Sequence, residues 1–134
     1  MRLFATLFLF LVLVLGASPV KAADPGITFD SGYPKWKSPQ PGDSWIVGSG
    51  RFTLPVGMYT YSIWLIAEDV DEPLLQYSDE AQTILIGPTD GSWSAVIPGI
   101  PLHDNYYVWA MLTIAWQNGT VDHYYTNVAS LLVP

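Results

Sequence analysis

Residues 90–110 limit the possible folds more than any other stretch of the sequence. Asp90 and Gly91 form a turn signal, an alternating run continues to Ile97, and a Pro-Gly corner leads into a long aromatic run. Short β-branched and aromatic runs separated by Gly, Pro, Asn and Asp are typical of antiparallel strands, because these separators interrupt helices and form turns. The stretch therefore predicts an all-β chain.

Similar punctuation recurs along the chain at intervals of about ten residues, as expected of a β-sandwich. After a short lead that contains Ile27 and Phe29, the predicted strands span residues 45–47 with 51–54, 58–68, 83–86, 92–97, 105–117 and 121–132. Residues 73–82 are predicted as a loop, and no helix is predicted after residue 22. Asn118 and Gly119 predict a tight hairpin turn with positive φ at both positions.

The first 22 residues have the order of a cleavable signal peptide. Arg2 precedes an apolar run over residues 3–15, and small residues follow up to Ala22. The run is shorter than the roughly 20 residues that span a bilayer. We therefore expect cleavage after Ala22, a secreted or periplasmic protein, and no membrane insertion after cleavage. The remainder is predicted to be one domain, with a proline-rich lead and the first short strand at residues 23–43 and a sandwich at residues 44–134.

The charge and the cysteine content narrow the expected partners. After residue 22, only the three cations Lys35, Lys37 and Arg51 stand against twelve carboxylates, which leaves a net charge of −9. Nucleic acids and anionic membrane surfaces bind basic proteins, so neither is an expected partner. The chain has no cysteine, so its stability is expected to come from packing rather than from disulfide bonds.

One motif resembles the corner region of fibronectin type III domains. Residues 97–100 read Ile-Pro-Gly-Ile, and Tyr106 and Val108 follow. In such domains a corner tyrosine begins the next strand, and its hydroxyl holds the preceding loop. The resemblance implies this role for Tyr106. The residues expected to be structural are Trp93, Ile97, Ile100, Tyr106 and Val108.

A second set of residues looks like parts of the bacterial immunoglobulin-like domains of surface and exported proteins. The set comprises Asp90, Gly91, Ser92, Trp93 and Ser94, then Ser38, Pro39, Pro41 and Gly42, and the run with Val47, Gly48 and Gly50. Together the two resemblances imply an antiparallel immunoglobulin-like or fibronectin type III-like sandwich of about seven strands. They imply no catalytic residue set.

Strand alternation predicts aromatic side chains on one outer sheet face. With Tyr106 inward, every second residue to Ile114 points inward, and the residues between them point outward. The same reasoning directs a tryptophan of the neighbouring strand outward. The predicted ligand or partner site is Trp64, Tyr107 and Trp109, extended by Tyr124 of the last strand.

Rigid aromatic side chains on an exposed face suit two kinds of ligand, because they offer a large contact area at little entropic cost. The first expected function is non-catalytic recognition of a protein, including a second copy of this chain, in adhesion or assembly. The alternative is a small carbohydrate-binding protein that stacks sugar rings on the same aromatics. A third interpretation is that no such patch is exposed, either because the proline-rich loop at residues 33–43 covers these side chains or because the strand phase differs by one residue.

The acidic residues form one weak candidate for a metal site. Glu68, Asp69, Asp71 and Glu72 could offer oxygens to Ca²⁺, which takes about six to eight of them. They lack the regular spacing and the central glycine of a calcium loop. A solvated acidic loop is therefore the preferred interpretation, and no metal is predicted.

No residue set specifies a reaction. His103 and His123 are the only histidines, and the chain has neither a Gly-x-Ser-x-Gly motif nor a cysteine nucleophile. Asp122 beside His123 offers one carboxylate, but the spacing matches no zinc motif. We therefore expect no catalytic residue, no cofactor and no enzymatic activity.

Overall fold

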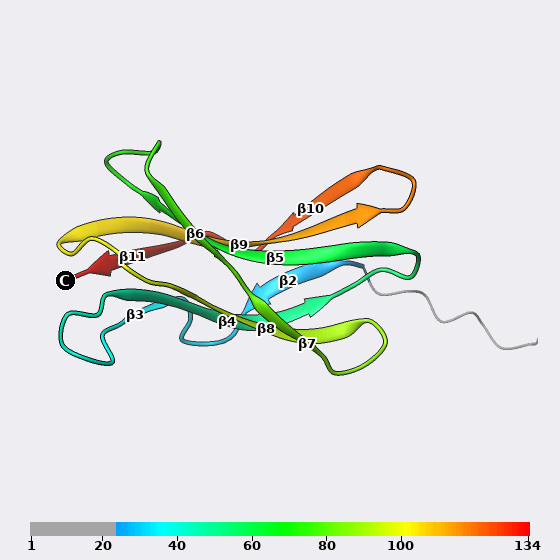
Figure 1. Cartoon of the computed structure of the whole chain (residues 1–134), viewed down its shortest axis with the longest axis horizontal. Helices are drawn as coiled ribbons and strands as arrows, with labels where there is room; N and C mark the ends of the chain where they lie inside the picture. Colours follow the sequence, from blue (N-terminus) through cyan, green and yellow to red (C-terminus); the bar gives the residue numbers. More distant parts are fainter. Residues whose placement is uncertain (1–23) are drawn as a thin grey trace, which may run out of the picture.

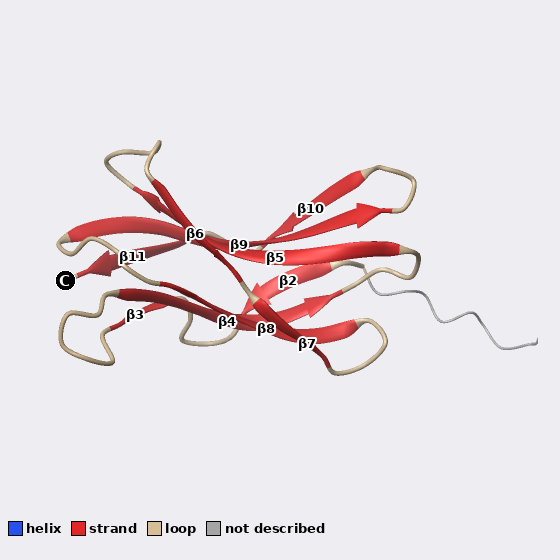
Figure 2. Ribbon diagram, viewed as in Figure 1, coloured by secondary structure: helices blue, strands red, loops and turns tan. Residues whose placement is uncertain are grey.

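The computed structural model describes residues 24–134, and the regular secondary structure of these residues consists of β-strands alone (Figure 2). Two antiparallel sheets lie one above the other in a sandwich-like arrangement (Figure 1). The β5–β9 sheet contains β10 (Val121–Tyr125), β9 (Asp104–Trp116), β5 (Tyr59–Asp69) and β6 (Gln76–Glu80), with β11 (Ala129–Val133) also paired to β9. The β4–β8 sheet contains β2 (Gly26–Phe29), β4 (Trp45–Thr53), β8 (Asp90–Ile97) and β7 (Gln82–Leu85), with β3 (Lys35–Lys37) also paired to β4.

Residues 24–134 form ten strands, whereas about seven were expected. Two of the additional strands lie in segments predicted as loops: β3 in the proline-rich loop and β6 within residues 73–82. The chain then changes sheet at Ala81, whose amide donates to the Ile63 carbonyl at 2.8 Å. Most side chains of β6 are exposed, so this edge strand has too little apolar alternation to be recognised in the sequence.

The predicted strand at residues 121–132 is divided because Thr126 directs its side chain at β9. Its Oγ1 accepts a hydrogen bond from the Ala110 amide at 2.9 Å and donates one to the Asn127 carbonyl at 2.9 Å. The buried hydroxyl thus satisfies a β9 amide that a continuous strand would have paired. As a result, β10 and β11 pair with different parts of β9.

By contrast, β4 is continuous where two short strands were predicted, and its two glycines make room for packing. A Cβ at Gly48 would lie 3.0 Å from the ring of Trp93, and a Cβ at Gly50 would overlap the carbonyl oxygen of Thr28. The missing side chains therefore let Trp93 and β2 approach the β4 backbone closely. The prediction treated these glycines as a break and was wrong.

The core lies between the sheets and follows the expected alternation. On β9 the buried side chains are Tyr106, Val108, Ala110, Leu112 and Ile114, and on β5 they include Ile63 and Leu65. The facing layer contributes Ile46, Phe52, Trp93, Ala95 and Ile97. Folding transfers these apolar side chains from water into one layer between the sheets. This burial is the main stabilising contribution in a chain without disulfides.

The corner between β8 and β9 is fixed by Tyr106. Its ring is buried, and its hydroxyl donates to the Pro101 carbonyl at 3.1 Å. Ile100 is also buried, and its amide donates to the Ser44 carbonyl at 3.0 Å. These contacts set the inward phase of β9, and the side chains at the alternate positions must face outward.

The predicted signal peptide lies outside the described residues. Within residues 24–134, the structure contains no helix with the length and apolar character needed to cross a bilayer.

Candidate functional site

The outer side of the β5–β9 sheet carries a continuous apolar surface, which we call the aromatic face. It consists of Trp64, Ile66, Tyr107, Trp109, Met111 and Tyr125. Trp64 lies directly opposite Met111, and Ile66 lies directly opposite Trp109. Side chains at such positions are in contact range, so these four form one half-buried block. Tyr107 and Tyr125 flank it and are 41% and 57% exposed.

Three of the four predicted site residues lie on this face, and Tyr124 does not. Tyr124 is paired with the inward-facing Leu112 and packs against the core, whereas Tyr125 is paired with Met111 and points outward. The expected extension of the patch by Tyr124 is therefore corrected to Tyr125.

The difference arises at the hairpin turn between β9 and β10. A two-residue turn at Asn118 and Gly119 would pair Thr113 with Tyr124, but the observed pairing shifts by one residue. Only Gly119 has a positive φ, at 93°, and its amide donates to the Trp116 carbonyl at 3.0 Å. A register shift of one residue exchanges the two faces of a strand, so the observed turn places Tyr125 rather than Tyr124 on the outer side.

The indole N–H groups distinguish the tryptophans of the aromatic face from the tryptophans that support the fold. Nε1 of Trp93 donates to the Thr28 carbonyl at 3.2 Å, and Nε1 of Trp116 donates to Asp122 at 2.8 Å. Among residues 24–134, no group accepts a hydrogen bond from Nε1 of Trp64 or Trp109. These two tryptophans therefore offer an apolar ring and a free donor to a ligand.

Polar groups surround the aromatic face. Glu68 accepts a hydrogen bond from Gln76 at 3.0 Å, and Glu80 of the edge strand β6 lies opposite Trp64. On the other side, Thr113 and His123 are joined at 2.9 Å between Oγ1 and Nδ1. An apolar centre with a polar rim is the usual composition of a protein interface.

The proline-rich loop does not cover the aromatic face. Its strand β3 pairs with β4 and so belongs to the opposite sheet. Figure 1 shows this loop beside the lower sheet, while the β5–β6 and β9–β10 hairpins rise from the upper sheet at its two ends. The face therefore lies between two raised hairpins, and the interpretation that the loop buries it is excluded.

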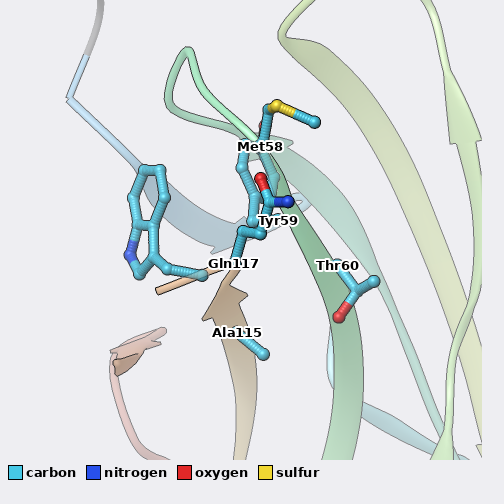
Figure 3. A pocket seen from close by; sticks show the side chains of 6 residues that line it. Met58, Tyr59, Thr60, Ala115 and Gln117 are labelled. Atoms are coloured by element: carbon cyan, nitrogen blue, oxygen red, sulfur yellow. The ribbon is translucent and has the colours of Figure 1, made fainter. Parts of the chain in front are cut away.

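One end of the same outer side is hollow. A cavity of about 400 Å³ is lined by Met58, Tyr59, Thr60, Ala115, Trp116 and Gln117. In Figure 3 the short side chains of Thr60 and Ala115 come from neighbouring strands, and Met58 and Gln117 lie beyond them. Thr60 and Ala115 are direct partners across β5 and β9. The two small residues of the lining are thus in line with the aromatic face, and the larger Met58, Tyr59, Trp116 and Gln117 complete the hollow.

The acidic cluster differs from the predicted one. Carboxylate oxygens of Asp69, Asp71 and Asp104 lie within 4.8 Å of one another. Oδ1 of Asp69 accepts from the amides of Asp71 at 2.9 Å and Glu72 at 3.2 Å, so Glu72 contributes its backbone. Glu68 points to the outer side with Gln76. Asp104 was missed because the sequence does not show that β9 begins beside the end of β5.

Asp69 and Asp104 share a hydrogen bond between their carboxyl groups. This bond lowers the pKa of Asp69, helped by the amides of Asp71 and Glu72 and opposed by burial. It raises the pKa of Asp104. Three carboxylates are few for Ca²⁺, and amides already occupy one oxygen of Asp69.

The histidines do not form a reactive pair with Asp122. On β10, Asp122 is paired with the inward-facing Ile114 and accepts from Trp116, while His123 is paired with Thr113 and faces outward. His103 is exposed in a turn, with a φ of 60°. Adjacent residues of a strand point to opposite sides, so their sequence proximity does not bring Asp122 and His123 together.

Comparisons with known proteins give no relative for this chain: no protein-family model, no curated protein sequence and no solved structure matches it.

Proposed function

We propose that this protein is a non-catalytic recognition module that binds a protein through the aromatic face. The observation that carries the proposal is the uncovered block of Trp64, Ile66, Trp109 and Met111, which groups two tryptophans with two aliphatic side chains on the outer side of one sheet. Contiguous exposed apolar patches mark interaction sites in soluble proteins. Tryptophan and tyrosine are also the side chains that contribute most to binding energy at protein interfaces.

The composition of the centre favours a protein over a polysaccharide. Ile66 and Met111 separate the two tryptophans, and neither side chain can orient a sugar hydroxyl. Methionine adapts its shape to apolar partners. The free indole N–H groups of Trp64 and Trp109 then have backbone carbonyls of the partner as their natural acceptors.

The finer fold assignment and the location belong to the same proposal. The tyrosine at the β8–β9 corner and the two antiparallel sheets support an immunoglobulin-like or fibronectin type III-like fold. The N-terminal sequence supports export to the periplasm or the outside of the cell. A rigid sheet face is well suited to such a role, because little conformational entropy is lost when it binds.

Site-specific photo-cross-linking in the cells that produce the protein tests the proposal without knowledge of the partner. A benzophenone amino acid would replace Tyr107, an exposed aromatic residue of the face. The matched control would carry the same group at Trp45, a half-buried aromatic residue on the outer side of the β4–β8 sheet. We expect a discrete protein adduct from position 107 and none from position 45.

Equal adducts at both positions, or none at either, would contradict the proposal. Adducts of broad mass that polysaccharide hydrolases remove would instead show a carbohydrate ligand. Native gels cast with polysaccharides give an independent check, because a protein-binding face leaves the mobility of wild type and of Trp109→Ala equal.

A further inference from the structure

The outer side of the β5–β9 sheet, which includes the aromatic face, has one half with large side chains and one half with small side chains, arranged evenly about one row. The central row contains Trp64 on β5 and Met111 on β9. Toward one end lie the large side chains Ile66, Glu68, Tyr107 and Trp109, and toward the other lie the small side chains Thr60, Ser62, Thr113 and Ala115. The hollow beside Thr60 and Ala115 belongs to the small half.

The two halves match in spacing because the pairing register is regular. Glu68 and Thr60 are equally far along β5 from Trp64, and Tyr107 and Ala115 are equally far along β9 from Met111. A two-fold axis over the central row, perpendicular to the strands and parallel to the sheet, would place each large half on a small half. Tyr107 of one copy would then lie over the hollow at Thr60 and Ala115 of the other.

We propose that the partner of the aromatic face is a second copy of this chain, bound face to face in a symmetric dimer about that axis. The proposal rests on the proposed function and names its partner. A two-fold interface uses the same surface on both copies and must be self-complementary. The fit of large residues on small ones meets that requirement.

The available area is at the low end of what such a dimer needs. Over this face β5 and β9 extend through nine residues each, and β6, β10 and β11 through five each. With strands about 4.8 Å apart and a rise of about 3.3 Å per residue, the face measures roughly 500 Å² per copy before side-chain relief is counted, against the roughly 800 Å² per partner of a typical stable interface.

The geometry tolerates the usual angle between packed sheets. Sheets that pack face to face cross at about 30° because of their twist, which displaces the ends of the strands sideways by about one strand spacing. The hollow extends over both β5 and β9, so a displaced Tyr107 still meets small side chains. The raised β5–β6 and β9–β10 hairpins of one copy would flank the other copy (Figure 1).

Charge sets the solution conditions for the dimer. Glu80 lies in the central row and would approach Glu80 of the second copy, and residues 23–134 carry only three cations against twelve carboxylates. Like charges repel less when salt screens them. The dimer should therefore tighten as ionic strength rises, the opposite of an interface formed by ion pairs.

The first test is sedimentation equilibrium of residues 24–134, which contain both complete sheets, over a range of concentration and salt. We expect a monomer–dimer equilibrium that Ala115→Arg weakens about tenfold or more, since the arginine fills the hollow. The matched control is Val96→Arg, a half-buried outward position of the opposite sheet, which should leave the dissociation constant unchanged.

Cross-linking tests the symmetry without disturbing the large aromatic residues. The chain has no cysteine of its own, so Glu68→Cys and Thr60→Cys each introduce one thiol. A short bismaleimide should join the two variants when they are mixed and should give little dimer with either alone. Ser94→Cys on the opposite sheet is the control and should give none.

The outcomes separate this inference from the proposed function. A monomer at all concentrations, together with a position 107 adduct to a different protein, would overturn the dimer and leave protein recognition standing. A monomer with no adduct would overturn both. A dimer that survives Ala115→Arg and gives no mixed 68–60 cross-link would use another surface and would also overturn the inference.

Discussion

The two outer sheet faces of the molecule are built by the same strand alternation and differ in what they carry. The β5–β9 sheet presents the aromatic face, whose two tryptophans have free indole N–H groups. The outer side of the β4–β8 sheet presents Lys35, Lys37 and Arg51, together with Ser49 and Thr53, which bond to Asp30 and Asp90 at 3.1 and 3.3 Å. This face also carries Trp45, Val47 and Val96, which are half-buried, and Ile84, which is 68% exposed. The two faces therefore differ in composition: the β5–β9 sheet groups two tryptophans and two tyrosines, whereas the β4–β8 sheet places a single tryptophan among cations and hydrogen-bonded hydroxyl groups.

The largest expected effect on the free energy of unfolding comes from a substitution in the inner layer rather than on either outer face. Trp93→Ala removes a fully buried ring that packs against Gly48 and Phe29, so it should lower the free energy of unfolding by about 3–5 kcal/mol. Urea denaturation followed by circular dichroism measures this. A loss below about 1 kcal/mol would mean that the core does not depend on the room made by the glycines of β4.

The next largest effect is a difference in partner binding between matched substitutions on the two outer faces. Trp109→Ala should weaken partner binding about tenfold or more, equivalent to about 1.4 kcal/mol, while it lowers the free energy of unfolding by only about 1 kcal/mol. Trp45→Ala, the matched change on the β4–β8 sheet, should leave binding unchanged. Sedimentation equilibrium and urea denaturation of both variants provide the two readouts. Equal losses of binding would remove the distinction between the faces.

A smaller effect tests the residue that sets the phase of β9. Burial raises the pKa of Tyr106 to about 12, with Asp104 adding to the shift. Because the folded pKa lies above the unfolded value near 10.0, the contribution of Tyr106 is complete below pH 10.0 and is lost as the pH rises toward 12.

Tyr106→Phe removes both this titration and the bond to Pro101, so it should cost about 1 kcal/mol at neutral pH and flatten the alkaline loss of stability. Denaturation at a series of pH values measures both effects. An unchanged alkaline profile would show that another tyrosine titrates in that range.

The smallest effect concerns the acidic end of the β5–β9 sheet. The raised pKa of Asp104 means that its contribution to stability is present at acidic pH and is lost as the pH rises through that pKa. Above it, the charges of Asp69 and Asp104 repel. Asp104→Asn should therefore raise Tm slightly at pH 7 and leave it nearly unchanged below the usual carboxyl value of 3.8. A lower Tm at pH 7 would instead indicate that the charged pair stabilises the fold, as a bound cation would require.

The sequence predicted the inward phase of β9 and β5, because Tyr106 and the aromatic alternation after it leave one consistent assignment. It could not predict the register of β10, which depends on the backbone conformation of Asn118 rather than on its identity, and so it placed Tyr124 outside. Ile66 was recoverable from the alternation of β5 but was overlooked in favour of aromatic residues. The pairing of Asp69 with Asp104 and the hollow at Thr60 and Ala115 depend on which strands become neighbours, and such long-range contacts leave no local signal.

The most direct test of the central claim is hydroxyl-radical footprinting of the protein in the cells that produce it, compared with the same protein purified and highly diluted. Trp64, Trp109 and Met111 on one face and Trp45 on the other are all readily oxidised side chains. The account predicts that the first three are protected in cells and become oxidised on dilution, while Trp45 is oxidised equally in both states. Equal oxidation of Trp64, Trp109 and Met111 in the two states would show that the aromatic face has no partner and would contradict the account.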